Sequence, residues 1–232
     1  MKINLKRIKK VYINLDGDNE RNNDICNFFN SLNYSNYERF GGARLKKQAR
    51  CFNIGCSTSH NQLMKKYKDH VPFILFEDDC KPTQWYNEYV VDGEIEVPDD
   101  ADVIYLGYST AGHHAWFRGQ PINDKWFLLE SCMATHAMIF LNKNAIETYI
   151  ENSTATIKEK IALDVGYARD ILTPKKLKVY APKKVLFYQN NGCVITTHVT
   201  VDFDNNNWTS YNHNNTVNFN RQIIYDNPPI IR

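Results

Sequence analysis

Apolar residues recur along the chain in short blocks that alternate with stretches of helical spacing. The blocks at 10–16, 71–76 and 101–107 are rich in β-branched and aromatic residues, so each predicts a strand. The run VPFILF at 71–76 is wholly apolar, which is expected of a strand covered on both faces. Further strands are predicted near 37–40, 134–141, 177–181 and 184–189.

Between these blocks, apolar residues are spaced as on one face of a helix. Ile25, Phe28 and Leu32 lie on such a face and predict a helix over 18–32, with Asp18 as its N-cap. Strands that alternate with helices predict an α/β fold with a mostly parallel sheet, which binds its ligands at the carboxyl ends of its strands. Further helices are predicted at 55–68, 84–91, 143–151 and 161–172.

The chain of 232 residues shows no internal repeat and no linker, so we predict a single domain over 1–232. Residues 202–232 are polar and rich in asparagine, and we predict that they form a C-terminal tail or lid. Residues 108–125 contain glycine, histidine and proline and are predicted to form a loop.

Composition narrows the classes of function. The formal net charge is +2 and the basic residues are scattered, which argues against nucleic-acid binding. No stretch approaches the ~20 apolar residues of a membrane helix, and the first residues do not resemble a signal peptide. The six cysteines form no CxxC pair, which is typical of reduced thiols. We therefore expect a cytoplasmic protein.

Three acids, Glu77, Asp78 and Asp79, directly follow the apolar run. Adjacent carboxylates at the end of a buried strand repel one another, so a cation is expected there, and oxygen ligands suit Mg²⁺ or Mn²⁺. In an extended segment Glu77 and Asp79 share one side and Asp78 faces the other. The alternative is that these are solvated acids that form a turn before Pro82.

Six motifs occur in order along the chain. They are VYINLDGDNER (11–21), RFGGA (39–43), IGCSTSHNQLMKKY (54–67), FILFEDDC (73–80), ADVIYLG (101–107) and LDVGYARDIL (163–172). Together they resemble glycosyltransferase family 25, the lipopolysaccharide and collagen galactosyltransferase type, which has a GT-A fold. The chain is short for the family, and its C-terminal part matches weakly.

The resemblance implies a metal-dependent transfer from a nucleoside-diphosphate sugar, UDP-linked, to a glycan or glycoconjugate hydroxyl with inversion, as in lipopolysaccharide biosynthesis. It also implies peripheral contact with membrane-linked glycans at most.

The resemblance implies roles for four acids. Asp79 is the expected metal ligand, while Glu77 and Asp78 are expected to hold metal, ribose or donor sugar. Asp164, at the start of a predicted helix, is expected to be the general base that takes the proton of the acceptor hydroxyl. It could instead be an aspartate that complements the helix dipole, and Asp170 is the second candidate base.

Other polar residues are candidates for nucleotide binding. Asn14, Leu15 and Arg21 lie at the end of the first predicted strand and in the turn after it, where an open α/β sheet holds a base and ribose, and Arg21 could pair with a diphosphate. His60 is a candidate contact to the nucleotide, and His198 a candidate second metal ligand. The alternatives are a surface arginine and core or surface histidines.

Two rival functions fit the same pattern less well. A metal-dependent phosphotransferase or nucleotidyltransferase also needs acids at a strand end, but no P-loop motif is present. A degenerate nucleotide-sugar or glycan-binding module would have the fold without turnover, which the intact acid triplet argues against.

Overall fold

The computed structural model describes part of the chain, and beyond Gln189 it describes only the backbone of three strands. The described residues are 1–43, 51–109, 118–189, 198–202, 207–212 and 215–217.

An eight-stranded sheet forms the centre of the molecule, in the order β3-β2-β4-β11-β8-β12-β10-β9. Its strands are β2 (Lys9–Leu15), β3 (Tyr37–Gly42), β4 (Phe73–Glu77), β8 (Val103–Ser109), β9 (Arg118–Pro121), β10 (Trp126–Ser131), β11 (Met133–Phe140) and β12 (Val179–Pro182). The β3–β2, β2–β4 and β8–β12 pairs are parallel, and the other four pairs are antiparallel.

The sheet is therefore mixed, which corrects the prediction of a mostly parallel one. The prediction assumed that a helix follows each strand, but no described helix lies between β8 and β11. A parallel connection needs a crossover of a dozen or more residues, so the short connection between β9 and β10 makes them antiparallel. Strand β9 also lies inside the predicted 108–125 loop; residues 110–117 of that loop are outside the described part.

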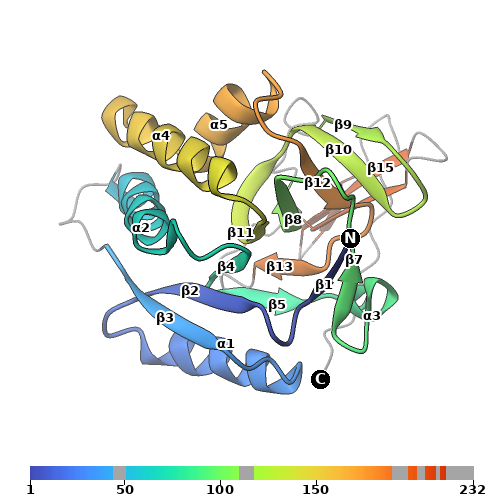
Figure 1. The fold of residues 1–232 in the computed structure, drawn as a ribbon, viewed down its shortest axis with the longest axis horizontal. Helices are drawn as coiled ribbons and strands as arrows, with labels where there is room; N and C mark the ends of the chain where they lie inside the picture. Colours follow the sequence, from blue (N-terminus) through green and yellow to red (C-terminus); the bar gives the residue numbers. More distant parts are fainter. Residues whose placement is uncertain (44–50, 110–117, 190–197, 203–206, 213–214, 218–232) are drawn as a thin grey trace.

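Helices cover both faces of the sheet (Figure 1). On one face lies α1 (Asn19–Ser31), which Asp18 caps as predicted by accepting a hydrogen bond from the Arg21 amide. On the other face lie α2 (Cys51–Tyr67), α4 (Lys143–Glu159) and α5 (Leu163–Tyr167), and α5 continues as the π-helical segment η2 (Ala168–Leu172).

Smaller elements complete the described chain. Strands β1 (Lys2–Asn4), β7 (Glu94–Glu96) and β6 (Val90–Val91) form one sheet, and β5 (Cys80–Pro82) pairs with β13 (Phe187–Gln189). Strands β14 (His198–Asp202), β15 (Asn207–Asn212) and β16 (Asn215–Val217) form an antiparallel sheet. The helix predicted at 84–91 is only the single turn α3 (Tyr86–Tyr89), because the chain becomes extended at β6.

The alternation of side chains along β4 explains how the sheet positions its ends. Phe73 and Leu75 pack in one apolar cluster with residues of α2 and α4, and Ile74 and Phe76 pack in a second cluster with residues of α1. The prediction of a strand covered on both faces is confirmed. The strand ends at Glu77, and Asp78 and Asp79 form a turn. Contacts place Glu77 beside His60 of α2 and Asp78 beside Arg21 of α1.

Lys10, a buried lysine near the start of β2, is hydrogen-bonded to the backbone of two neighbouring segments of the chain. The Nζ atom of Lys10 donates hydrogen bonds to three carbonyl oxygens, those of Lys6 (3.1 Å), Ile8 (2.9 Å) and Ser35 (2.8 Å). The same atom lies 4.7 Å from the centre of the Tyr34 ring. Burial lowers the pKa of Lys10 from its ordinary value of 10.5 to about 8.

We expect Lys10→Met to lower the free energy of unfolding by about 2–4 kcal/mol at neutral pH, because it leaves three carbonyl groups without their donor. Between the folded pKa of about 8 and the unfolded value of 10.5 the unfolded state binds more protons. The wild type therefore gains stability as pH rises through this window, and the deficit of the variant should grow. Urea unfolding at several pH values measures both effects. Lys65→Met, on the exposed surface of α2, is the control and should change stability little; equal losses in the two variants would contradict the role of Lys10.

Candidate active site

Glu77, the last residue of β4, points toward α2 and is held by several neighbours. Its Oε1 accepts a hydrogen bond from Thr135 Oγ1 (3.0 Å) and lies 3.3 Å from His60 Nε2. Its Oε2 accepts a hydrogen bond from Gln189 Nε2 (3.2 Å). Burial alone would raise the pKa of Glu77, but His60 and Thr135 outweigh burial and lower it. Glu77 is therefore held as a carboxylate.

Asp78 points the opposite way and joins β4 to the end of β2 and the start of α1. Its carboxylate accepts hydrogen bonds from Asn14 Nδ2 (2.8 Å) and Arg21 Nη1 (3.1 Å). Arg39 Nε in turn donates to the amide oxygen of Asn14 (2.8 Å), which fixes the orientation of that amide. Burial raises the pKa of Asp78, while Asn14 and Arg21 oppose the rise. These contacts leave much of the Arg21 side chain, 41% exposed, open to a ligand.

Asp79 is the acid that has a buried oxygen atom without a hydrogen-bond partner among the described residues. Its side chain is buried, and its Oδ1 has no hydrogen-bond partner among the described residues. Burial, together with the charges of Glu77 and Asp78, raises the pKa of Asp79 to about 7. Gln189, which also binds Glu77, is within hydrogen-bonding reach of Asp79. Asp78 and Asp79 form a turn rather than the extended segment that the predicted alternation required, and both are buried rather than solvated. The buried oxygen without a described partner fits a cation ligand.

Asp164 lies in the first turn of α5 and reaches the same region. Its Oδ2 accepts a hydrogen bond from the Ala134 amide (3.2 Å) and its Oδ1 from the Val165 amide (2.8 Å). Burial raises the pKa of Asp164, and the charge of Glu77 adds to the rise. Ala134 has a left-handed φ of 69° within an irregular stretch of β11. Such strained conformations cluster at functional sites, and this one aims an amide at Asp164.

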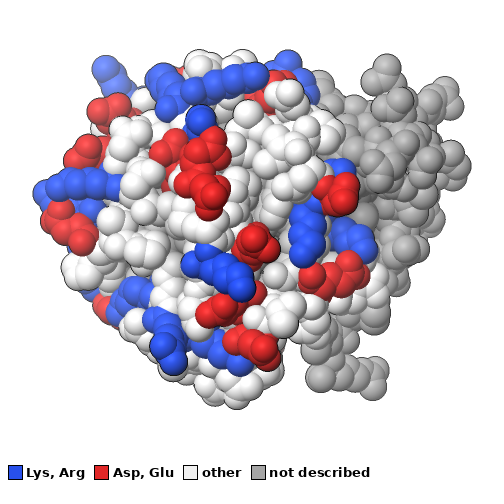
Figure 2. Space-filling model, turned by 45° about the vertical axis from the view of Figure 1, so that its right-hand side comes forward, with Lys and Arg blue, Asp and Glu red and all other residues white. Residues whose placement is uncertain are grey.

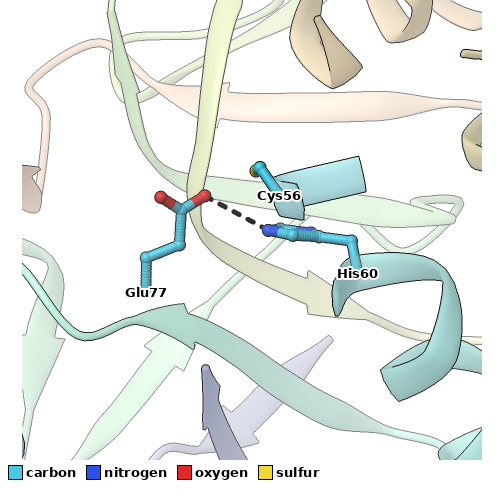
Figure 3. A group of neighbouring side chains, drawn as sticks. All are labelled: Cys56, His60 and Glu77. Atoms are coloured by element: carbon cyan, nitrogen blue, oxygen red, sulfur yellow. Dashed lines mark ion pairs between the residues drawn. The ribbon is translucent and has the colours of Figure 1, made fainter. Parts of the chain in front are cut away.

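Cys56 completes a cluster with His60 and Glu77. One ligand atom from each residue lies within 4.8 Å of the others, and the three side chains point toward one another (Figure 3). Burial raises the pKa of the Cys56 thiol, and the negative charges of Glu77, Asp164 and Asp79 raise it further. These four side chains, together with His60, therefore converge on one region.

The structure brings together seven of the predicted site residues. These are Asn14, Arg21, His60, Glu77, Asp78, Asp79 and Asp164. Leu15 is half-buried at the end of β2. His198 is the first residue of β14, and its side chain lies outside the described part. The second candidate base, Asp170, is paired with Arg169 (Nε to Oδ1, 2.6 Å).

Thr135, Gln189 and Cys56 belong to the site but were not predicted from the sequence. Cys56 had a usable signal, because it lies four residues before His60 and the two share one face of a helix. Thr135 and Gln189 carried none, since they reach Glu77 only through the pairing of β11 with β4 and of β13 with β5.

On the face shown in Figure 2, acidic and basic side chains lie intermixed, and no extended patch of one sign is visible. Among the helices of the described ranges, none combines the length and apolarity that a membrane crossing requires.

Gly107 in β8 keeps space for the His136 ring. A Cβ atom at this position would overlap Nε2 of His136, which hydrogen-bonds the Phe187 carbonyl at 3.1 Å. Gly107→Ala should therefore lower the free energy of unfolding by about 1–3 kcal/mol through overpacking, measured by chemical unfolding. Gly41→Ala is the control, because its Cβ would meet the Asp16 carboxylate at an ordinary 3.4 Å. A neutral Gly107→Ala would show that the ring moves freely.

Comparisons with known proteins do not establish a family for this chain. No protein-family model matches the chain, and no curated protein is similar to it, so membership of glycosyltransferase family 25 stays a prediction. Among solved structures, one similar chain is a glycosyltransferase involved in the glycosylation of the major capsid of PBCV-1. It is 8% identical, the match covers 80% of this chain and 93% of that one, and the TM-score is 0.47. A likeness of this size carries no functional argument, so the site is judged by its own residues.

Proposed function

We propose that this protein is a glycosyltransferase that moves a sugar from a nucleoside-diphosphate donor, UDP-linked, to a hydroxyl of a glycan or glycoconjugate. The observation that supports this proposal most directly is the convergence of Glu77, Asp79 and Asp164 beside the ends of β2 and β4, with an oxygen of Asp79 that has no described partner. A family-25-like activity is the form of this proposal that the sequence motifs favour.

The residues present fit a divalent cation such as Mn²⁺ or Mg²⁺. Asp79 would be its first ligand, with Glu77 beside it, because both offer hard oxygen atoms and both neighbour Gln189. A cation bound there would neutralise the charge that develops on the departing diphosphate. The exposed part of the Arg21 guanidinium is suited to pair with the same diphosphate, while Asn14 and Asp78 are suited to hold the ribose.

Asp164 is proposed to take the proton of the acceptor hydroxyl. The hydroxyl oxygen forms a bond to the anomeric carbon while the bond from that carbon to the diphosphate oxygen breaks, and the proton moves to the Asp164 carboxylate. This displacement inverts the anomeric configuration. A raised pKa supports the role, because a more basic carboxylate accepts a proton more readily.

The test is a thermal-shift screen of nucleotide sugars with and without Mn²⁺. A selective donor should stabilise the folded protein by about 2.7 kcal/mol at a hundredfold excess over its dissociation constant, and only when the cation is present. Release of the sugar from the stabilising donor then shows turnover. Binding without turnover would instead indicate a degenerate binding module, and no stabilisation by any nucleotide sugar would overturn the proposal.

A further inference from the structure

Cys56 and His60 form a pair on one face of α2. They are four residues apart, so their side chains project from successive turns of the helix toward the same neighbour, Glu77. The sulfur, one ring nitrogen and one carboxylate oxygen all lie within 4.8 Å of one another. Two ligands from one helix and a third from the end of a strand are an arrangement that can close around a single ion.

The imidazole of His60 is oriented but not satisfied. The ring is 1% exposed, and Nδ1 lies 2.8 Å from the Tyr149 hydroxyl, which fixes the ring plane. Nε2 faces Glu77 Oε1 at 3.3 Å but outside hydrogen-bond geometry, and it has no other partner in the described ranges. Histidines that bind metals are commonly held in this way through their second nitrogen. Nε2 therefore lies beside a carboxylate without a hydrogen bond, an arrangement that a cation bound to both groups would complete.

We propose that Cys56, His60 and Glu77 bind a zinc-class divalent cation, with a fourth position left for water. The mixed sulfur, nitrogen and oxygen donors suit Zn²⁺, whereas Mg²⁺ and Mn²⁺ prefer oxygen alone. In tetrahedral geometry, zinc bonds of about 2.3 Å to sulfur and about 2.0–2.1 Å to nitrogen place these two atoms about 3.6 Å apart. The ligand atoms lie within 4.8 Å of one another, so the side chains must move closer together when the ion binds. Binding converts the Cys56 thiol to a thiolate and releases its proton to solvent.

This site differs from the proposed Mg²⁺ or Mn²⁺ site for sugar transfer in its sulfur and nitrogen ligands. Glu77 is a candidate ligand in both sites. A zinc ion held by Cys56 and His60 would draw Glu77 away from Asp79. Zinc is then expected to compete with a Mg²⁺ or Mn²⁺ ion that uses both Glu77 and Asp79. Zinc bound at the cluster would therefore inhibit the proposed sugar transfer. The binding itself does not rest on the proposed function, because it needs neither a nucleotide nor turnover.

The experiment is a titration of the metal-free protein with Co²⁺, the spectroscopic stand-in for Zn²⁺. We expect a thiolate-to-cobalt charge-transfer band that saturates at one ion per chain, release of one proton per ion, and loss of the band when Zn²⁺ is added. Cys56→Ser should abolish the band. Cys26→Ser, which alters another half-buried helical thiol, should leave it unchanged.

Further variants guard against misfolding and other thiols. Cys56→Ala repeats the test if Cys56→Ser proves unstable by circular dichroism, and Glu77→Gln should weaken cobalt binding at least tenfold while the band remains. No band in the wild type, or a band that survives in folded Cys56 variants, would overturn the proposal. So would a band lost in Cys51→Ser or Cys193→Ser. The readout is optical and needs no sugar donor, so its failure leaves the proposed transferase activity standing, and the reverse also holds.

Discussion

Asp79→Asn is expected to stabilise the metal-free protein at alkaline pH and to abolish cation-dependent sugar transfer. The Asp79 carboxylate is buried with an oxygen that lacks a described partner, and its pKa of about 7 lies above the ordinary value of 3.8. A raised folded pKa means that the folded state binds the proton more tightly. Stability is therefore lost as pH rises from the unfolded value through about 7, and asparagine removes that loss.

The expected gain above neutral pH is about 2–4 kcal/mol, from about three pKa units at 1.36 kcal/mol each and allowing for coupling to Glu77 and Asp78. Urea unfolding in a chelator, from pH of about 4 to about 9, measures it as a difference that grows with pH. Asp170→Asn is the matched control, because Arg169 lowers the pKa of Asp170. Asp170→Asn should slightly lower the free energy of unfolding at pH values above 3.8, the ordinary pKa of an aspartate. If both substitutions changed the free energy of unfolding in the same direction, the raised pKa assigned to Asp79 would be contradicted.

The loss of sugar transfer and the gain in stability both follow from removing the negative charge of Asp79. An amide cannot replace a carboxylate in holding a hard divalent cation, so Mn²⁺ should no longer increase the affinity for a nucleotide diphosphate. Calorimetry with UDP, with and without Mn²⁺, measures this coupling. Unchanged turnover in Asp79→Asn would exclude the metal role of this residue.

Asp164→Asn is expected to lower kcat by about 10²–10⁴-fold while the affinity for the donor stays the same. The amides of Ala134 and Val165 hold the Asp164 carboxylate in place, and asparagine keeps its shape but cannot take a proton. Steady-state kinetics with the donor found in the screen separate kcat from donor binding.

The pH dependence gives a second check on Asp164. Because burial raises its pKa, the wild-type rate should begin to fall at a higher pH than an ordinary aspartate would cause, and this acidic limb should vanish in Asp164→Asn. Asp170→Asn should keep both the limb and the rate. A variant that loses donor affinity rather than kcat would show that Asp164 serves binding instead.

Much of the fold could be predicted because it depends on local pattern. The wholly apolar run 73–76 predicts a strand covered on both faces, and alternate side chains of that strand do pack in two different clusters. Glu77 and Asp78 also have different neighbours, but Asp78 lies in the turn after the strand. Asp18 could be predicted as a helix cap because capping is a contact between near neighbours in sequence.

The rest depended on contacts between residues far apart in the chain. The direction of β11 follows from its pairing with β4 and β8, which apolar pattern alone does not specify. Gln189 reaches Glu77 only because β13 pairs with β5, and its sequence neighbourhood looks like an ordinary strand end. The strained Ala134 gave no signal, since alanine is not a residue expected at positive φ.

The bond from Gln189 to Glu77 joins residues 112 positions apart, which has a consequence for synthesis on the ribosome. Glu77, Asp78 and Asp79 leave the exit tunnel of the ribosome long before β13, the strand that carries Gln189, leaves it. Until β13 arrives, a nascent chain must carry Glu77 and Asp79 without their amide neighbour. Cellular Mg²⁺ could screen these charges during that interval, so refolding from urea should slow in its absence, with the delay confined to the step that docks β13 onto β5.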